Sequence, residues 1–277
     1  MKKRFDELCF EISKSTTEKY STSFSLGILA LHASIRPAIY AIYGFVRLAD
    51  EIVDSFHDYD KAVLLMRLKD DTSKALDEKI SLNPILQSFQ ETVHQYKIDG
   101  DLIEQFFHSM EMDLYKTSFD SEEYKNYILG SAEVVGLMCL KVFTHANARL
   151  YEELRPFAMK LGSAFQKVNF LRDVKEDYQL LGRTYFPNME MNVFDSSIKL
   201  QIEQEIEAEF KEAMIGIRKL PASAKFGVYL ACKYYFSLFK KIKKTPAEKI
   251  FSERVRISNG HKLSLAMSSF VQYKIAF

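Results

Sequence analysis

Residues 43–54 read YGFVRLADEIVD, and this stretch indicates most about the fold of the chain. The 3.6-residue period of an α-helix places four of its polar side chains on one face: Tyr43, Arg47, Asp50 and Asp54. Most of the other positions are Ala, Ile, Val, Leu or Phe. Carboxylates in such apolar surroundings are costly to bury unless something neutralises them. The stretch therefore predicts a largely buried helix with one polar stripe that needs a partner.

A second stripe of similar design lies more than a hundred residues further on. It consists of Gln166, Asn169, Asp173 and Asp177, again among apolar neighbours. Because Mg²⁺ prefers oxygen ligands and often shares its shell with phosphates, two such stripes facing one cavity would form a cation site. The alternative is an exposed ion pair on each helix, Arg47 with Asp50 and Arg172 with Glu176.

The composition predicts a helical protein. The chain has 277 residues, of which 47% are hydrophobic, with only 10 Gly and 6 Pro, so long helices and short connections are expected. No strand-type alternation is sustained, and we expect one all-α domain over residues 1–277. The expected helices cover residues 38–56, 61–80, 84–100, 101–115, 122–143, 151–181, 196–219 and 225–244.

Several function classes are disfavoured. The net charge of +1 provides no global attraction for nucleic acid, and no recognition motif for it is present. Cys9, Cys139 and Cys232 are far apart, which suits a reducing compartment. The sequence contains no P-loop, nucleophile elbow or Gly-rich dinucleotide fingerprint. No apolar stretch follows the charged first residues, so a cytoplasmic location is expected, with peripheral membrane contact as an alternative.

Two further segments carry groups that suit anions. Tyr20, Ser21, Thr22 and Ser23 form a hydroxyl-rich run that suits phosphate oxygens, or equally the N-cap of a helix. Arg254 presents a planar fork of donors for an anionic group; the alternative is a solvated surface.

Taken together, these stretches resemble the squalene/phytoene synthase family. Residues 43–54 are similar to its first aspartate-rich motif, and residues 161–177, LGSAFQKVNFLRDVKED, are similar to the second. GRTYFP at residues 182–187 follows at the expected place. The resemblance extends from about residue 15 to residue 265 and implies an isoprenoid synthase fold, a single helical domain around a central cavity.

The resemblance also implies an activity. Members condense two prenyl diphosphates head to head (1′–1) through a cyclopropylcarbinyl diphosphate, with Mg²⁺ or alternatively Mn²⁺. The expected reaction is that of a bacterial-type phytoene synthase, from two geranylgeranyl diphosphates to phytoene through prephytoene diphosphate. One alternative is a squalene or dehydrosqualene synthase that uses farnesyl diphosphate, and squalene formation would need NADPH. Another is a non-catalytic helical scaffold. The sequence leaves open whether the protein is a monomer or a homodimer.

Residue roles follow from the resemblance position by position. The implied metal ligands are Asp50, Asp54, Asn169, Asp173 and Asp177. The implied substrate contacts are Tyr20, Ser21, Ser23, Tyr43, Arg47, Gln166, Arg172, Tyr235 and Arg254. The implied catalytic group comprises Tyr43, Arg47, Asp50, Asp54, Arg172, Asp173 and Asp177. The chain departs from the family at Leu129 and Glu133, where members commonly have Tyr and part of a Gly-Thr pair, and at Tyr20, which is often His.

Overall fold

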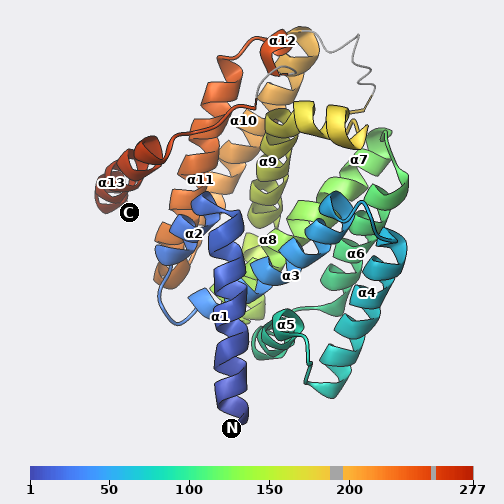
Figure 1. Ribbon diagram of the computed structural model, residues 1–277. Coiled ribbons are helices and arrows are strands. Elements are labelled where there is room, and N and C mark those ends of the chain that lie inside the picture. The colour runs from blue at the N-terminus through green and yellow to red at the C-terminus, as the bar shows by residue number, and fades with distance from the viewer. Residues whose placement is uncertain (188–195, 251–253, 277) are drawn as a thin grey trace.

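The structure is a computed structural model that describes residues 1–187, 196–250 and 254–276. Within these ranges the chain is almost entirely helical (Figure 1). Extended pairing among the described residues is limited to one isolated bridge, between Ser118 and Thr184. The expectation of an all-α protein is confirmed.

The helices follow one another with short connections. In chain order they are α1 (Lys2–Tyr20), α2 (Thr22–Leu29), α3 (Arg36–Ser55), α4 (Lys61–Glu78), α5 (Pro84–Tyr96), α6 (Gly100–Tyr115), α7 (Ser121–Ile128), the π-helix η1 (Leu129–Glu133), α8 (Val134–Phe143), α9 (Ala148–Leu181), α10 (Ser196–Lys219), α11 (Ala222–Lys243), α12 (Ala247–Ile250) and α13 (Asn259–Ala276). Each expected helix is found within a few residues of its predicted bounds, except that the single helix expected over 122–143 is interrupted by η1.

Local side chains explain where several helices begin and end. The Asp60 carboxylate accepts a hydrogen bond from the Val63 amide at the start of α4. Asp120 and Glu123 form a capping box at the start of α7. Lys79 and Lys97 adopt a left-handed conformation just after α4 and α5, where Gly is the usual residue. Such ends keep the connections short and pack consecutive helices against each other.

The core places α3 at the centre of the molecule. This helix packs against α1, α4, α5 and α8 and crosses the middle of the bundle in Figure 1. Phe45 of α3 is fully buried, and its ring stacks on Phe89 of α5 with ring centroids 3.9 Å apart. Because one side of α3 is fixed in this way, its polar stripe faces the interior on the other side.

Glycines allow close helix contacts around the cavity, and Gly227 and Gly216 are two examples. At Gly227 on α11 a Cβ atom would lie 2.4 Å from Leu31 and 2.7 Å from the Gly27 carbonyl oxygen, so α11 approaches α2 closely. At Gly216 on α10 a Cβ atom would lie 2.3 Å from the Cβ of Phe157 on α9. These four helices therefore pack closely around one end of an internal cavity, which they enclose together with α3 and α8.

One helical stretch has the length and composition of a membrane span. Among the described residues this is Ser121–Phe143, which comprises α7, η1 and α8. It packs against α6 and α9, and buried core helices of soluble proteins commonly have the same length and composition. Its packing is that of a core helix.

Candidate active site

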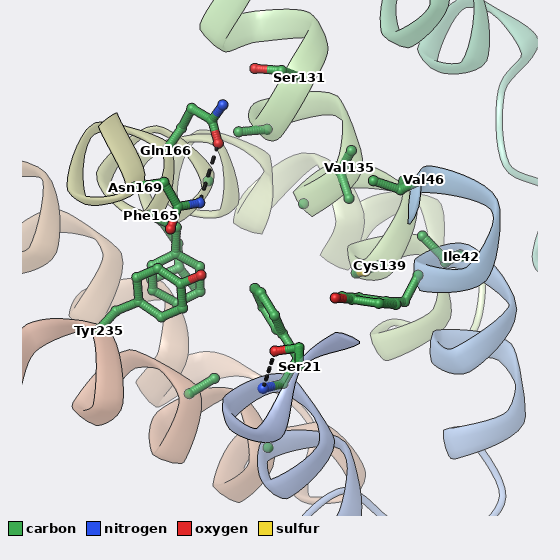
Figure 2. A pocket seen from close by; sticks show the side chains of 18 of the residues that line it. Ser21, Ile42, Val46, Ser131, Val135, Cys139, Phe165, Gln166, Asn169 and Tyr235 are labelled. Atoms are coloured by element: carbon green, nitrogen blue, oxygen red, sulfur yellow. Dashed lines mark hydrogen bonds between the residues drawn. The ribbon is translucent and has the colours of Figure 1, made fainter. Parts of the chain in front are cut away.

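Both aspartate stripes line the same cavity. It has a volume of about 730 Å³, within the range of about 300–1,000 Å³ that is typical of ligand pockets. The side chains that α3 and α9 contribute to it from the stripes are Tyr43, Arg47, Asp50, Asp54, Gln166, Asn169, Asp173 and Asp177. The alternative of exposed ion pairs on two unrelated helix surfaces is therefore wrong. Figure 2 shows Gln166 and Asn169 of α9 across the hollow from Ile42 and Val46 of α3.

The carboxylates in this cavity repel one another. Burial, followed by the charge of Asp54, raises the pKa of Asp50 to about 7. Burial, and then the charges of Asp173 and Asp54, raises the pKa of Asp177 to about 8. Burial also raises the pKa of Asp54, although Arg183 acts in the opposite direction. The site carries more negative charge than its surroundings compensate, and a bound cation would relieve this.

The donor set fits Mg²⁺ that is shared with a phosphate. Within the described ranges no three His, Cys, Asp or Glu side chains lie close enough together to hold a metal ion by themselves. The oxygen donors come from two facing helices, and the buried Asn169 Oδ1 atom has no hydrogen-bond partner among the residues that the structure describes. Mg²⁺ typically takes one or two carboxylates and completes its shell with water and substrate phosphates. These residues fit a magnesium site that is completed by a diphosphate.

Arg47 is held by Glu51 instead of Asp50. Its Nε donates to Glu51 Oε2 at 3.1 Å, and its guanidinium lies over the Tyr20 ring, 4.3 Å from the centroid. Residues three and four apart on a helix are both neighbours, and here the later of the two acids takes the contact. Within the described part of the chain, Asp50 is thereby left without a cation in ion-pair contact, and it lines the cavity.

Arg172 and Arg254 meet at the second stripe. Arg172 Nε donates to Asp173 Oδ1 at 2.9 Å. Arg254 approaches the same carboxylate at 2.9 Å and donates to Glu176 Oε2 at 2.7 Å. The alternative pairing of Arg172 with Glu176 is therefore wrong, because Arg254 occupies Glu176. Arg254 contacts carboxylates of α9 in this structure, and its contact with substrate stays a prediction.

Aromatic rings line the cavity beside the polar groups. Tyr235 stacks on Phe165 with ring centroids 3.9 Å apart (Figure 2). The centroid of the Phe24 ring lies 5.7 Å from those of both Tyr43 and Tyr235. Burial raises the pKa of Tyr43 to about 12, so its hydroxyl keeps the proton at neutral pH. The cavity therefore offers ring faces without an ionised oxygen nucleophile from Tyr43.

Only part of the hydroxyl-rich segment, residues 20–23, lines the cavity. Ser21 caps α2, because its Oγ accepts from the Phe24 amide at 3.2 Å, and it also lines the cavity with Tyr20. Ser23 is not among the residues that line the cavity, and its contact with substrate stays a prediction. Both interpretations of the segment, a helix cap and a cavity wall, apply to Ser21.

A buried network next to the stripes was not predicted. Asp113 of α6 accepts hydrogen bonds from the hydroxyls of Tyr127 at 2.6 Å and Tyr185 at 3.1 Å. Arg183 Nη1 lies 3.4 Å from Asp113 and 3.3 Å from Asp54, so it links this network to the first stripe. The available sequence signal was an isolated Asp between Met112 and Leu114 in a predicted helix. That signal does not reveal its partners, which are distant in sequence.

The match to known proteins agrees with this geometry. Residues 17–261 match the family model described as squalene/phytoene synthase. The chain belongs to the squalene/phytoene synthase family. Enzymes of this family are prenyltransferases that bind prenyl diphosphates and use a divalent metal. The substrates of this family carry diphosphates on apolar chains. The chain offers both environments: the two stripes with Arg47, Arg172 and Arg254, and the apolar cavity.

Individual relatives differ in the substrate that their names imply. The chain is 28% identical to 4,4'-diapophytoene synthase of Staphylococcus haemolyticus over 72% of this chain and 68% of that protein. It is 26% identical to 15-cis-phytoene synthase of Synechocystis over 93% of this chain and 83% of that protein. Phytoene synthase 1 of Zea mays is also 26% identical, over 95% of this chain and 67% of its own.

Solved structures show the same fold. A dehydrosqualene synthase in complex with a ligand superposes with a TM-score of 0.83 at 20% identity, covering 97% of this chain and 98% of its own. YisP from Bacillus subtilis superposes with a TM-score of 0.73 at 16% identity, covering 96% and 98%. The isoprenoid synthase fold expected from the sequence is confirmed.

The departures from the family motif lie at η1. Leu129 and Glu133 are the first and last residues of this π-helix, and Glu133 is not among the residues that line the cavity. Burial, then Glu209, raises the pKa of Glu133 to about 7. Nearby, Lys167 donates to Glu209 at 2.9 Å between α9 and α10. Glu133 thus belongs to a polar cluster behind the cavity wall.

Proposed function

We propose that the chain condenses two geranylgeranyl diphosphates head to head (1′–1) to phytoene through prephytoene diphosphate. The observation that carries this proposal is that two aspartate stripes meet across one deep apolar cavity in a squalene/phytoene synthase. Charged diphosphates and long apolar chains need these two environments side by side. The proposed order is ionisation of the first substrate, capture by the double bond of the second, proton loss, re-ionisation and rearrangement.

The acidic side chains bind the metal ion in this proposal. Mg²⁺, or alternatively Mn²⁺, would be held by Asp50, Asp54, Asn169, Asp173 and Asp177. When bound, the metal neutralises charge that develops on the departing diphosphate. Binding at these acids requires the deprotonated forms of Asp50 and Asp177, whose pKa values of about 7 and about 8 the cation would lower.

The arginines orient the diphosphate. Arg47, Arg172 and Arg254 now contact Glu51, Asp173 and Glu176, and a diphosphate offers each guanidinium a stronger partner. Such preorganised cations stabilise the charge of the leaving group as it forms.

The aromatic wall protects the carbocation. Phe24, Phe165 and Tyr235 present ring faces to the cavity interior, and ring faces attract positive charge. An apolar lining also excludes water, which would otherwise quench the cation as an alcohol. Gln166 and Asn169, which lie within 3.5 Å of each other, separate this wall from the acids.

The length of the cavity supports a C20 substrate. Phe157 lines it sixteen residues before Asp173 on α9, a span of about 24 Å at 1.5 Å per residue. An extended geranylgeranyl chain of about 20 Å, built from C–C bonds of about 1.5 Å, fits this span. A farnesyl chain would leave the far end unfilled.

The alternative is a C30 synthase that uses farnesyl diphosphate. It is favoured by the likeness to the diapophytoene synthase and to the dehydrosqualene synthase structure. NADPH enters only if the product is squalene. A non-catalytic scaffold is the weaker alternative, because both pairs of aspartates are present and lie in the cavity. A monomer or homodimer in the cytoplasm, with peripheral membrane contact, stays a prediction.

The test is incubation of purified protein and Mg²⁺ with C15 or C20 diphosphate, with and without NADPH, followed by mass analysis of the hydrocarbon. The proposal expects phytoene from the C20 substrate without NADPH. Formation of a C30 hydrocarbon in preference to phytoene would favour the alternative. Absence of a coupled product from either substrate would refute the activity.

A further inference from the structure

Lys262 joins the C-terminal helix to the segment that contributes Tyr20 and Ser21 to the cavity wall. It lies in the first turn of α13, the helix that projects to one side of the bundle beyond α11 in Figure 1. Its ammonium group donates a hydrogen bond to the Thr22 hydroxyl at the start of α2. Thr22 follows Ser21, which lines the cavity and points into it in Figure 2. The contact therefore joins α13 to the polar rim of the cavity.

The segment that leads to Lys262 is fixed against the bundle. Arg254, at its start, contacts Asp173 and Glu176 of α9. Val255 is buried, and Lys241 of α11 donates to the Arg256 carbonyl oxygen at 2.7 Å. Within this segment Arg254 thus contacts α9 and Lys262 contacts the start of α2.

The charge around Lys262 is unbalanced. The rim arginines Arg47, Arg172 and Arg254 each contact a carboxylate. Lys262 has no carboxylate within ion-pair distance in the part of the chain that the structure describes. Partial burial, and then the positive charge of Arg172, lowers its pKa. Arg172 and Lys262 are thus close enough to repel each other, and an anion bound by both would relieve this repulsion.

We propose that Lys262 binds the diphosphate of a prenyl substrate together with Arg172. This rests on the proposed function, because the diphosphate is the anion which that function brings to the rim. Arg172 is held by Asp173, one of the acids assigned to the metal. If Asp173 held a cation, the Arg172 guanidinium would be available to the diphosphate together with Lys262. Thr22 holds the Lys262 ammonium in position until the anion arrives.

Calorimetric titration of the full chain with inorganic pyrophosphate, in the presence of Mg²⁺, tests this. Lys262→Met should weaken binding by about tenfold or more, the size expected for one hydrogen bond to a charged group. Lys262→Arg should recover most of the affinity. Lys219→Met is the matched control, because it removes the same charge at the other end of α9 and α10, where Lys219 pairs with Glu153. It should bind like wild type.

Thr22→Val separates an anion contact from a structural tether. It removes the hydrogen bond and keeps the Lys262 charge, so pyrophosphate affinity should change less than for Lys262→Met. Equal losses in both variants would show a tether and overturn the inference. Unchanged affinity in Lys262→Met, with Lys262→Gln as a second neutral variant, would overturn it as well.

The same preparations distinguish this inference from the proposed function. Hydrocarbon formation from C20 diphosphate by the wild-type protein tests the function by itself. If wild type forms phytoene and Lys262→Met binds pyrophosphate normally, only the inference fails. If wild type binds pyrophosphate through Lys262 and forms no coupled product, only the proposed function fails.

Discussion

Substitutions at Asp113 and Arg183 should respond to pH in opposite directions. Both side chains are buried, with exposed fractions of 3% and 7%, and they lie 3.4 Å apart. Asp113→Asn keeps the shape and resembles the protonated acid, which predominates below the raised pKa of about 7. At pH 6 we therefore expect a cost of about 1–2 kcal/mol from altered hydrogen bonds, or a fall in melting temperature of about 2–8 °C. As the pH rises through 7, ionisation of Asp113 destabilises the wild type and not the variant, so the cost of Asp113→Asn should fall.

The unfolding free energy lost through Arg183→Met should be small at pH 6. The pKa of Asp113 is already about 7, because burial raises it more than Arg183 lowers it. Without Arg183 this pKa rises further, so Asp113 is neutral at pH 6 and still bonded to Tyr127 and Tyr185. The loss is then that of the Arg183 hydrogen bonds, about 1–2 kcal/mol.

The cost of Arg183→Met should grow with pH. A carboxylic acid whose folded pKa lies above its unfolded value binds extra protons in the native state, so stability falls as pH rises toward the folded pKa. Urea unfolding of both variants at pH 6 and pH 9 measures this. If the cost of Arg183→Met does not grow between pH 6 and pH 9, or the cost of Asp113→Asn does not fall, the assignment of the network is wrong.

Three further predictions concern the cluster behind the wall, the metal and the far end of the cavity. Glu133→Gln should stabilise the protein by about 1–2 kcal/mol at pH 8 and have little effect at pH 5, because the raised pKa of about 7 makes the ionised form unfavourable. Urea unfolding at the two pH values measures this difference. Mg²⁺ with pyrophosphate should raise the melting temperature more at pH 8 than at pH 6, since Asp50 and Asp177 must lose protons to bind, and an equal shift would contradict this. Phe157→Ala should raise kcat/KM for a C25 diphosphate relative to C20 by about tenfold in competition, whereas an unchanged ratio would show that Phe157 does not limit the length.

The sequence was sufficient for the parts of the fold and site that depend on local periodicity. Asp50, Asp54, Asp173 and Asp177 repeat at helical spacing among apolar residues, so their helices and their shared direction follow from the sequence. Long apolar stretches likewise predicted the helices close to their observed bounds. Tyr235, on α11, was placed in the cavity only through the family resemblance, since no local pattern marks it.

What the sequence did not reveal depends on tertiary contacts. The sequence did not identify Glu51 as the partner of Arg47, because partners three and four residues away are both compatible with a helix. The network of Asp113 and Arg183 joins residues 70 positions apart. The π-helix η1 fits the close packing of Gly162, whose Cβ would lie 2.7 Å from the Ala132 carbonyl oxygen, and no residue pattern marks it. Lys262 reaches Thr22 over 240 positions.

The most direct test of the account is pyrophosphate release from geranylgeranyl diphosphate by wild type, Asp50→Asn and Asp177→Asn at saturating Mg²⁺. These substitutions remove a proposed metal ligand from each facing helix with little change of shape. We predict that each lowers the rate by about a hundredfold or more, as loss of one electrostatic contact to a leaving group does. Release at the wild-type rate by either variant would contradict a diphosphate site between the two stripes.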